Sequence, residues 1–349
     1  MFTEQSSQIL ALLRSGQVVE IGGKPPLRAR IPAGSSPSTT RLVLAFAAIY
    51  LIWGSTFLGI RYAVETIPPL LMMGARHLVA GCLLYLWVRL RGAPAPVSKH
   101  WVSAGVAGAV LFLGGHGTLA WAEQRVPSGL AALLSATLPL WVVLLARVKG
   151  RDRHLGWRAG VGLILGFAGV ALLIGPDAFH SSSGMSLLGV GAVLFGAFTW
   201  GVGTIYTQDA KLPPSSILSA AMQMLTGGLS LFCVGLLAGE AGRLHLSTVS
   251  AKSALSLLYL IIFGSIIAFT AFTWLNRASS PTRVSTYAYV NPVVAVLLGW
   301  AMADEVIGVR ILVATAVILA SVALVNRLQQ PAKVEAMVER DWGQKAACE

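Results

Sequence analysis

The sequence predicts an all-α membrane protein: ten transmembrane helices in two inverted five-helix repeats around a central cavity. Three observations lead to this fold class: a low charge content, apolar segments of membrane-spanning length, and matching residues in the two halves of the chain. Only 11% of the 349 residues are charged and 55% are hydrophobic, whereas about 25% are charged in a typical soluble domain. A chain so poor in charge cannot cover a water-facing surface, which argues against a large soluble α/β domain.

The apolar residues form blocks of the length that a bilayer requires. Crossing a hydrocarbon core of about 30 Å takes about 20 helical residues. Because lipid offers the backbone no hydrogen bonds, and the alternation of a β-barrel is absent, the blocks are expected to be helices. They cover roughly 42–63, 69–90, 101–121, 127–147, 157–175, 186–207, 215–238, 253–275, 282–302 and 308–326.

The net charge of +12 does not indicate a nucleic-acid partner, because Lys and Arg lie in short loops between apolar blocks rather than on one face. The positive-inside rule places both termini in the cytoplasm. The prediction is therefore a multi-pass protein of the plasma (inner) membrane. Residues 1–40 form a flexible cytoplasmic N-terminal tail, and residues 327–349 form a cytoplasmic C-terminal tail. Cys82, Cys233 and Cys348 have no ligand spacing, so neither a metal site nor a disulfide framework is expected.

The two halves of the chain, 42–175 and 186–326, match each other in order. Since each half has an odd number of spans, the halves insert with opposite orientations, which is typical of secondary transporters with a site near mid-membrane. The matched residues are Trp53-Gly54 with Trp200-Gly201, Pro68-Pro69 with Pro213-Pro214, and Trp121 and Pro139 with Trp274 and Pro292 at an offset of 153.

Several stretches resemble the EamA repeat of the drug/metabolite transporter superfamily: Ile52 to Phe57, Arg76 to Gly81, and Val126 to Ala132 with Pro139 downstream. Two later stretches, Phe263 to Ala268 and Ser285 to Ala295, look especially like the YedA-type exporters of that family. The resemblance covers about 42–326. It implies two five-helix repeats, a central cavity and alternating access, with export of metabolites or drugs as the usual activity.

Aromatic and polar residues within the spans are the expected lining of the cavity. Trp and Tyr combine a large apolar face with one polar group, which suits amphipathic metabolites. The alternative is an interfacial belt, which fits Trp53 poorly because it lies well inside its span. The predicted substrate-binding residues are Trp53, Ser55, Thr56, Arg76, His116, Trp200, Thr204, Trp274, Tyr287, Tyr289 and Asn291.

Charged groups within a span need a partner or a function. Arg76 either neutralises an anionic group of the solute, closes an outer gate, or is a structural charge paired with Glu123. Glu123 itself fits an interfacial charge beside Arg125. Lone histidines such as His77 and His116 are more often structural, although both could titrate near neutral pH. No Asp or Glu lies at mid-membrane, which argues against proton coupling through a carboxylate and leaves facilitated, exchange or histidine-relay mechanisms open.

Two prolines are candidate hinges. Pro292 follows Asn291 inside the ninth block and would free a backbone carbonyl there, and Pro139 is its counterpart in the first half. Helix packing is the alternative explanation of this break.

No catalytic signature is present, whether a phosphate loop, HExxH, GxSxG or a nucleotide fingerprint, so neither enzyme activity nor a cofactor is expected. The predicted function is a secondary transporter that exports small amphipathic metabolites or drugs by alternating access. A channel, a non-transporting membrane scaffold, and an intramembrane lipid enzyme are the alternatives. The expected partners are a small-molecule substrate and the lipid bilayer, and the sequence does not indicate the oligomeric state.

Overall fold

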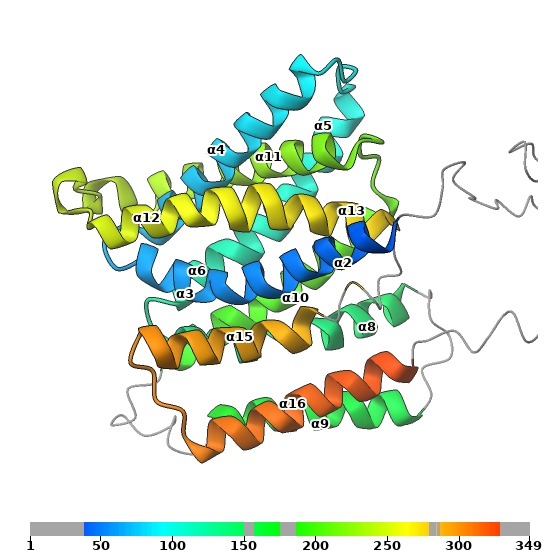
Figure 1. The fold of residues 1–349 in the computed structure, drawn as a ribbon, viewed down its shortest axis with the longest axis vertical. Coiled ribbons are helices and arrows are strands. Elements are labelled where there is room, and N and C mark those ends of the chain that lie inside the picture. Colours follow the sequence, from blue (N-terminus) through cyan, green and yellow to red (C-terminus); the bar gives the residue numbers. More distant parts are fainter. Residues whose placement is uncertain (1–37, 150–156, 175–185, 279–283, 285–286, 329–349) are drawn as a thin grey trace, which may run out of the picture. The chain divides into compact units, whose positions relative to one another are not determined.

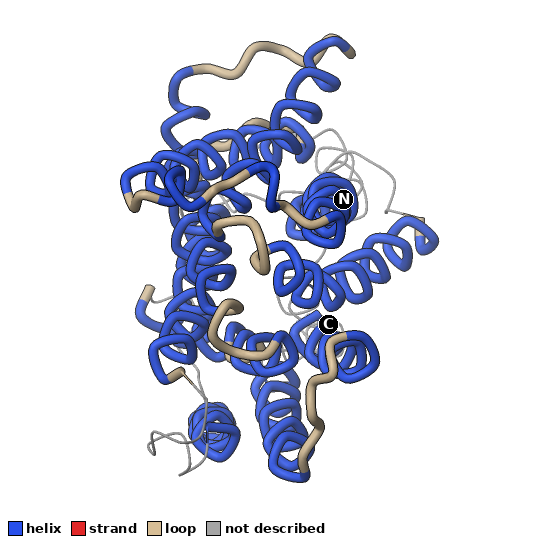
Figure 2. Tube along the Cα trace, turned by 90° about the vertical axis from the view of Figure 1, so that its left-hand side faces the viewer, coloured by secondary structure: helices blue, strands red, loops and turns tan. Residues whose placement is uncertain are grey.

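The computed structural model describes residues 38–149, 157–174, 186–278, 284 and 287–328. The chain divides into residues 1–42 and 43–349, and the arrangement below concerns the second of these units. Its described residues form helices joined by short loops, without a β-strand (Figure 2). The predicted tails, 1–40 and 327–349, lie almost entirely outside the described residues.

Each of the ten predicted blocks contains a described helix. In chain order they are α2 (Thr39–Ala47), η1 (Ala48–Ile52), α3 (Trp53–Ala63), α4 (Pro69–Leu90), α5 (Ser98–Gly108), η2 (Ala109–Gly117), α6 (Thr118–Ala122), α7 (Ser128–Ser135), α8 (Leu138–Val148), α9 (Trp157–Ile174), α10 (Leu187–Asp209), α11 (Ser216–Leu237), η4 (Glu240–Arg243), η5 (Leu246–Thr248), α12 (Ala251–Tyr259), η6 (Leu260–Phe269), α13 (Thr270–Ala278), α15 (Tyr287–Met302) and α16 (Val309–Leu328).

Seven of the described helices are long and apolar enough to cross a membrane, and 290–302 and 309–321 form shorter apolar helices. The described residues are thus helical throughout their regular structure, which is consistent with the predicted α-helical membrane protein. The total of ten spans and the inverted relation of the halves stay predictions.

Glycine allows α4 and α11 to pack closely side by side (Figure 1). A Cβ at Gly81 would lie 2.9 Å from the backbone nitrogen of Leu225, and one at Gly228 would lie 2.7 Å from that of Leu78. The two backbones therefore approach to a distance that larger side chains would prevent, as in other membrane helix pairs. This pair joins the first half of the chain to the second.

Wide π-helical turns interrupt three of the long helices. They are η1, η2 and η6, and η2 and η6 occupy matching places in the third and eighth blocks. π-Helical turns are rare and are frequent at functional sites, because they rotate side chains and shift backbone carbonyls. η2 contributes Gly115 and His116 to the lining of the cavity described below, and η1 and η6 contact residues that line it.

Four loops gather at one end of the second unit, on the left of Figure 1. These loops, residues 64–68, 123–127, 239–250 and 303–308, each carry a glutamate, and we call this end the glutamate end. Hydrogen bonds and an ion pair tie the first half of the chain to the second here. They run from Leu71 N to Glu240 Oε2 (2.9 Å), Ser250 N to Thr66 Oγ1 (3.2 Å), Ser253 Oγ to Tyr62 O (2.7 Å), Tyr62 Oη to Met302 O, and Lys252 Nζ to Glu65 Oε2 (2.5 Å).

The close approach of α4 and α11 is open to a direct test. Gly228→Ala should lower thermal stability, because the added methyl group overlaps backbone atoms of α4, and overpacking costs about 1–3 kcal/mol. Gly191→Ala in α10 is the matched control, since a Cβ there meets no atom within 4 Å. Thermal unfolding in detergent, followed by size-exclusion chromatography, measures both. Equal melting temperatures for the two variants would contradict this packing.

Candidate functional site

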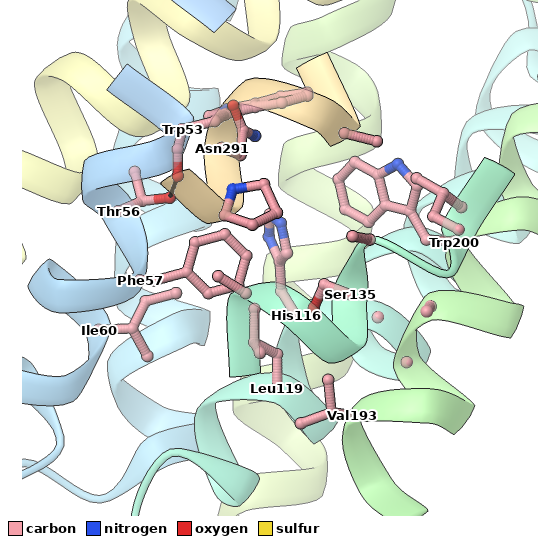
Figure 3. A pocket seen from close by; sticks show the side chains of 18 of the residues that line it. Trp53, Thr56, Phe57, Ile60, His116, Leu119, Ser135, Val193, Trp200 and Asn291 are labelled. Carbon is pink, nitrogen blue, oxygen red and sulfur yellow. Dashed lines mark hydrogen bonds between the residues drawn. The ribbon is translucent and has the colours of Figure 1, made fainter. Parts of the chain in front are cut away.

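A cavity lies among α3, α4, η2, α6, α7, α8, α10 and α15. Its empty volume is about 750 Å³, including open solvent. Figure 3 shows Trp53, Thr56 and Phe57 entering from α3, and His116 and Trp200 approaching from η2 and α10. Much of the wall is apolar, and its polar groups converge from several helices, an arrangement that suits an amphipathic solute.

The structure brings most of the predicted substrate residues together. The predicted residues that line the cavity are Trp53, Thr56, Arg76, His116, Trp200, Tyr287 and Asn291, and the predicted hinge residue Pro292 lies beside them. They come from both halves of the chain, and the cavity therefore requires both halves.

Three other predicted residues do not line the cavity. The hydroxyl of Ser55 instead bonds to Ile52 O and Tyr259 Oη, at 2.8 and 2.5 Å. The hydroxyl of Thr204 is used within its own helix, where it donates to Trp200 O at 2.8 Å. Trp274 is half-buried on α13, away from the lining. The side chain of Tyr289 lies outside the described residues.

Two tryptophans that correspond in the repeat meet at the cavity. The rings of Trp53 and Trp200 lie edge to face with centroids 6.0 Å apart, and Tyr287 lies edge to face with Trp53 at 5.2 Å. Trp53 Nε1 donates to Gly264 O in η6 at 3.1 Å, which fixes the orientation of its ring. These aromatic faces can hold a planar apolar group.

Arg76 is the buried cation of the cavity and is only 1% exposed. Its Nε donates to Ser265 Oγ at 2.8 Å, and its Nη1 contacts Met73 Sδ at 3.6 Å. Gly264 makes room for it, because a Cβ there would lie 2.7 Å from Arg76 Nη2. Sequence reasoning did not select Ser265 as a site residue. Its signal was present in the Phe263 to Ala268 stretch, but a serine in an apolar block does not reveal its partner.

The predicted charge pair between Arg76 and Glu123 is not formed in this conformation. Arg76 bonds to neutral groups, while neither carboxyl oxygen of Glu123 has a hydrogen-bond partner among the described residues. An outer gate built from this pair stays a prediction for another conformation.

The buried His77 of α4 and the half-buried His116 of η2 form a pair. His77 Nε2 lies 3.0 Å from His116 Nδ1, and their rings stack with centroids 5.1 Å apart. The ring of His116 also lies against that of Trp200, tilted by 30° with centroids 4.6 Å apart. One imidazole therefore donates to the other, so the two form a coupled unit rather than two isolated histidines.

Asn291 connects α15 to the wide turn η1. With its amide nitrogen facing the backbone carbonyls, it donates to Tyr50 O at 2.9 Å and to Ile49 O at 3.2 Å. Pro292 lies inside α15, whereas Pro139 lies in the first turn of α8, directly after the break that separates α7 from α8. Both prolines are therefore beside irregular backbone, and their role as hinges stays a prediction.

Two carboxyl groups near the glutamate end differ in their partners. Glu305 accepts from Ser128 N and Oγ at 2.7 Å each and from Gly129 N at 2.9 Å, which caps the start of α7. Glu123 lies in an end loop two residues before the exposed Arg125, as expected of an interfacial charge, but its own side chain is fully buried. Burial, reinforced by the nearby charge of Glu305, raises the pKa of the Glu123 carboxyl well above its usual range, although Arg61 and Arg76 act in the opposite direction.

The described residues contain no group of three or more His, Cys, Asp or Glu side chains that could hold a metal ion. The cavity lining therefore offers the guanidinium of Arg76, the imidazole of His116, hydroxyl and amide groups, and aromatic faces.

Comparisons with known proteins agree on one family. The EamA-like transporter family matches residues 40–175 and 187–327. The chain is 39% identical over 285 residues to "Uncharacterized inner membrane transporter YedA" of Escherichia coli K12, covering 81% of this chain and 89% of that protein. It is 27% identical over 281 residues to a WAT1-related chloroplastic protein of Arabidopsis thaliana, covering 79% and 67%.

A more distant relative is the "Uncharacterized transporter YvbV" of Bacillus subtilis, 24% identical over 298 residues and covering 85% of this chain and 95% of that one. A crystal structure that is 20% identical covers 83% of this chain and 98% of its own, with a TM-score of 0.59. That likeness shows that the fold occurs in a solved structure.

The cap that Glu305 places on α7 should be important for stability. Glu305→Gln removes the negative charge from three donors, and hydrogen bonds to charged groups contribute about 1.5–3 kcal/mol. We therefore expect a clear drop in melting temperature. Glu65→Gln is the matched control, because its partly exposed ion pair with Lys252 should contribute at most about 1 kcal/mol. A larger drop for Glu65→Gln than for Glu305→Gln would refute this ranking.

Proposed function

The chain belongs to the EamA-like transporter family, and from this premise we propose that it exports small amphipathic anions by alternating access. It is a transporter and not an enzyme, as the sequence predicted. The proposal adds a solute class, a direction and a mechanism to that membership. It also places the protein in the plasma (inner) membrane with both termini in the cytoplasm.

The observation that carries the solute class is Arg76 in an aromatic cavity. Its guanidinium is buried and contacts a serine hydroxyl and a methionine sulfur rather than a carboxylate. A cation at such depth is costly unless a counter-charge or water accompanies it. An anionic group of the solute would supply that charge, while Trp53 and Trp200 hold its apolar part.

Repeated packing supports the inverted repeats. Gly54 of α3 packs against Asn291 and Val294 of α15, and Gly201 of α10 packs against Leu138 and Trp141 of α8. Gly201 is the counterpart of Gly54, and the offset of 153 relates Leu138 to Asn291 and Trp141 to Val294. The same contact therefore occurs once in each direction between the halves, as a two-fold pseudosymmetry requires.

Closure at the glutamate end supports the direction. The distribution of Lys and Arg places this end outside the cell. There, hydrogen bonds and an ion pair join the two halves, and Glu305 from the second half caps α7 in the first. A carrier closed on the outside is ready to load from the cytoplasm, which is the first step of export.

A channel or a non-transporting scaffold is the alternative that flux can exclude. We expect reconstituted protein to move naphthalene-1-sulfonate, a permanent aromatic anion, at a rate that saturates with its concentration. N-methylquinolinium, an aromatic cation of similar size, should move far more slowly because Arg76 repels it. Fluorescence of the transported probe in proteoliposomes measures both. A rate that rises linearly without saturation would indicate a channel, and no rate above protein-free liposomes would indicate a scaffold.

Arg76 should decide the anion preference. Arg76→Gln removes one charge-assisted contact of about 1.5–3 kcal/mol, which corresponds to a roughly 10- to 100-fold loss in transport efficiency for the sulfonate. Arg125→Gln is the matched control, because Arg125 is exposed at the glutamate end and lies over the ring of Trp121. Normal sulfonate transport by a well-folded Arg76→Gln protein would exclude this role.

A further inference from the structure

Two carboxyl groups share one region at the glutamate end but divide its donors unequally. Glu305 receives three hydrogen bonds, two of them from backbone N–H groups, which is the environment of an ionised carboxylate. Glu123 is 0% exposed, and both of its carboxyl oxygens lack a hydrogen-bond partner among the described residues. An ionised carboxylate so placed would carry the full penalty of a buried, unpaired charge.

The cations around Glu123 are engaged elsewhere. Arg61 of α3 donates from Nη1 to the backbone carbonyl of Glu123 at 2.7 Å, and not to its carboxyl group. Arg76 of α4 is held by Ser265, and Arg125 lies over the ring of Trp121. The ionised Glu305 adds a negative charge nearby. With these neighbours the neutral, protonated form of Glu123 is the one that fits this conformation.

Glu123 lies at the outer boundary of the cavity. Its backbone N–H bonds to the carbonyl of Leu119, which lines the cavity one helical turn earlier. On α3, the cavity-lining Ile60 directly precedes Arg61. Any opening of the glutamate end that lets water reach Leu119 and Ile60 would therefore also reach the Glu123 carboxyl group and its neighbour Arg61.

We infer that Glu123 is a proton-binding site of the outer gate, protonated while the gate is closed and ionised once the gate opens. The inference rests on the proposed alternating access. On opening, the O–H bond of the carboxyl group breaks and the proton passes to outer water. The carboxylate that remains is stabilised by water and by Arg61, whose guanidinium is already bonded to the same residue. Closing reverses the step and takes up one proton from outside.

The sign of the pH dependence follows from this linkage. Low external pH favours the protonated, closed gate, and high pH favours the ionised, open gate. In the pH range where Glu123 is protonated in the closed state and ionised in the open state, the ratio of open to closed protein rises by up to about tenfold per pH unit. Glutamine in place of Glu123 imitates the protonated form and should keep the gate closed at every pH.

The test measures access to the cavity from the glutamate end and needs no solute. In a chain with Cys82, Cys233 and Cys348 replaced by serine, Leu119→Cys reports opening. A membrane-impermeant methanethiosulfonate is added to the outside of right-side-out vesicles between pH 6 and 9. Dividing each rate by that of Leu246→Cys, an 80% exposed loop position, removes the intrinsic pH dependence of the thiol.

We expect the normalised rate to rise with pH in the parent chain, to be low and flat in Glu123→Gln, and to rise again in Glu123→Asp, which restores a titrating group. Asp304→Asn, which removes an exposed carboxylate at the same end, should leave the rise unchanged. A flat parent profile, or an unaltered rise in Glu123→Gln, would overturn the inference. Failure of the transport proposal is distinguishable, because naphthalene-1-sulfonate flux would then be absent while the pH-dependent labelling persisted.

Discussion

The structure depends on one constraint: a guanidinium lies within an apolar helical bundle, bonded to a serine and a methionine and to no carboxylate among the described residues. Burial of Arg76 requires a wide turn in η6, a glycine at 264 to make room, and the hydroxyl of Ser265 as acceptor. The same turn presents the carbonyl that orients Trp53. The groups that accommodate Arg76 thus also orient the aromatic wall of the cavity, and they place its positive charge where the proposed anionic solute would bind.

The glutamate end meets a second electrostatic requirement with two carboxyl groups in different states. Glu305 is surrounded by donors and connects the loop before α16 to the start of α7, so its charge stabilises contact between the two halves. Glu123 has no such donors and is buried behind the lining of the cavity. A fixed anion next to a neutral acid is a common way to separate the roles of two carboxyl groups, and here it relates closure of one end to binding of a proton.

Much of this arrangement could be predicted from the sequence, because the lengths of the apolar segments and the residue matches between the two halves can be read along the chain. The helices, the cavity, and the convergence of Trp53, Trp200 and Asn291 followed from these. The failures have a common cause. The hydroxyl of Thr204 bonds within its own helix, and that of Ser55 bonds both to Ile52 O nearby and to Tyr259 far along the chain. A sequence does not show which of these partners a hydroxyl will have. The burial of Glu123 and the partnership of Arg76 with Ser265 depend on contacts between residues far apart in the chain, for which periodicity gives no signal.

The central claim is that the cavity opens alternately to the cytoplasm and to the outside, and that the glutamate end is the outer gate. Tyr62 in the first half of the chain donates a hydrogen bond to Met302 O in the second. Cross-linking Tyr62→Cys to Met302→Cys with a bifunctional thiol reagent would therefore keep the outer gate closed. Access from each side is measured with a cysteine in place of Ala197, which lines the cavity. Its thiol is protected with a reversible reagent during cross-linking and deprotected before labelling. The account predicts that cross-linking abolishes labelling from outside while labelling from the cytoplasmic side persists. Undiminished labelling from outside after complete cross-linking would contradict it.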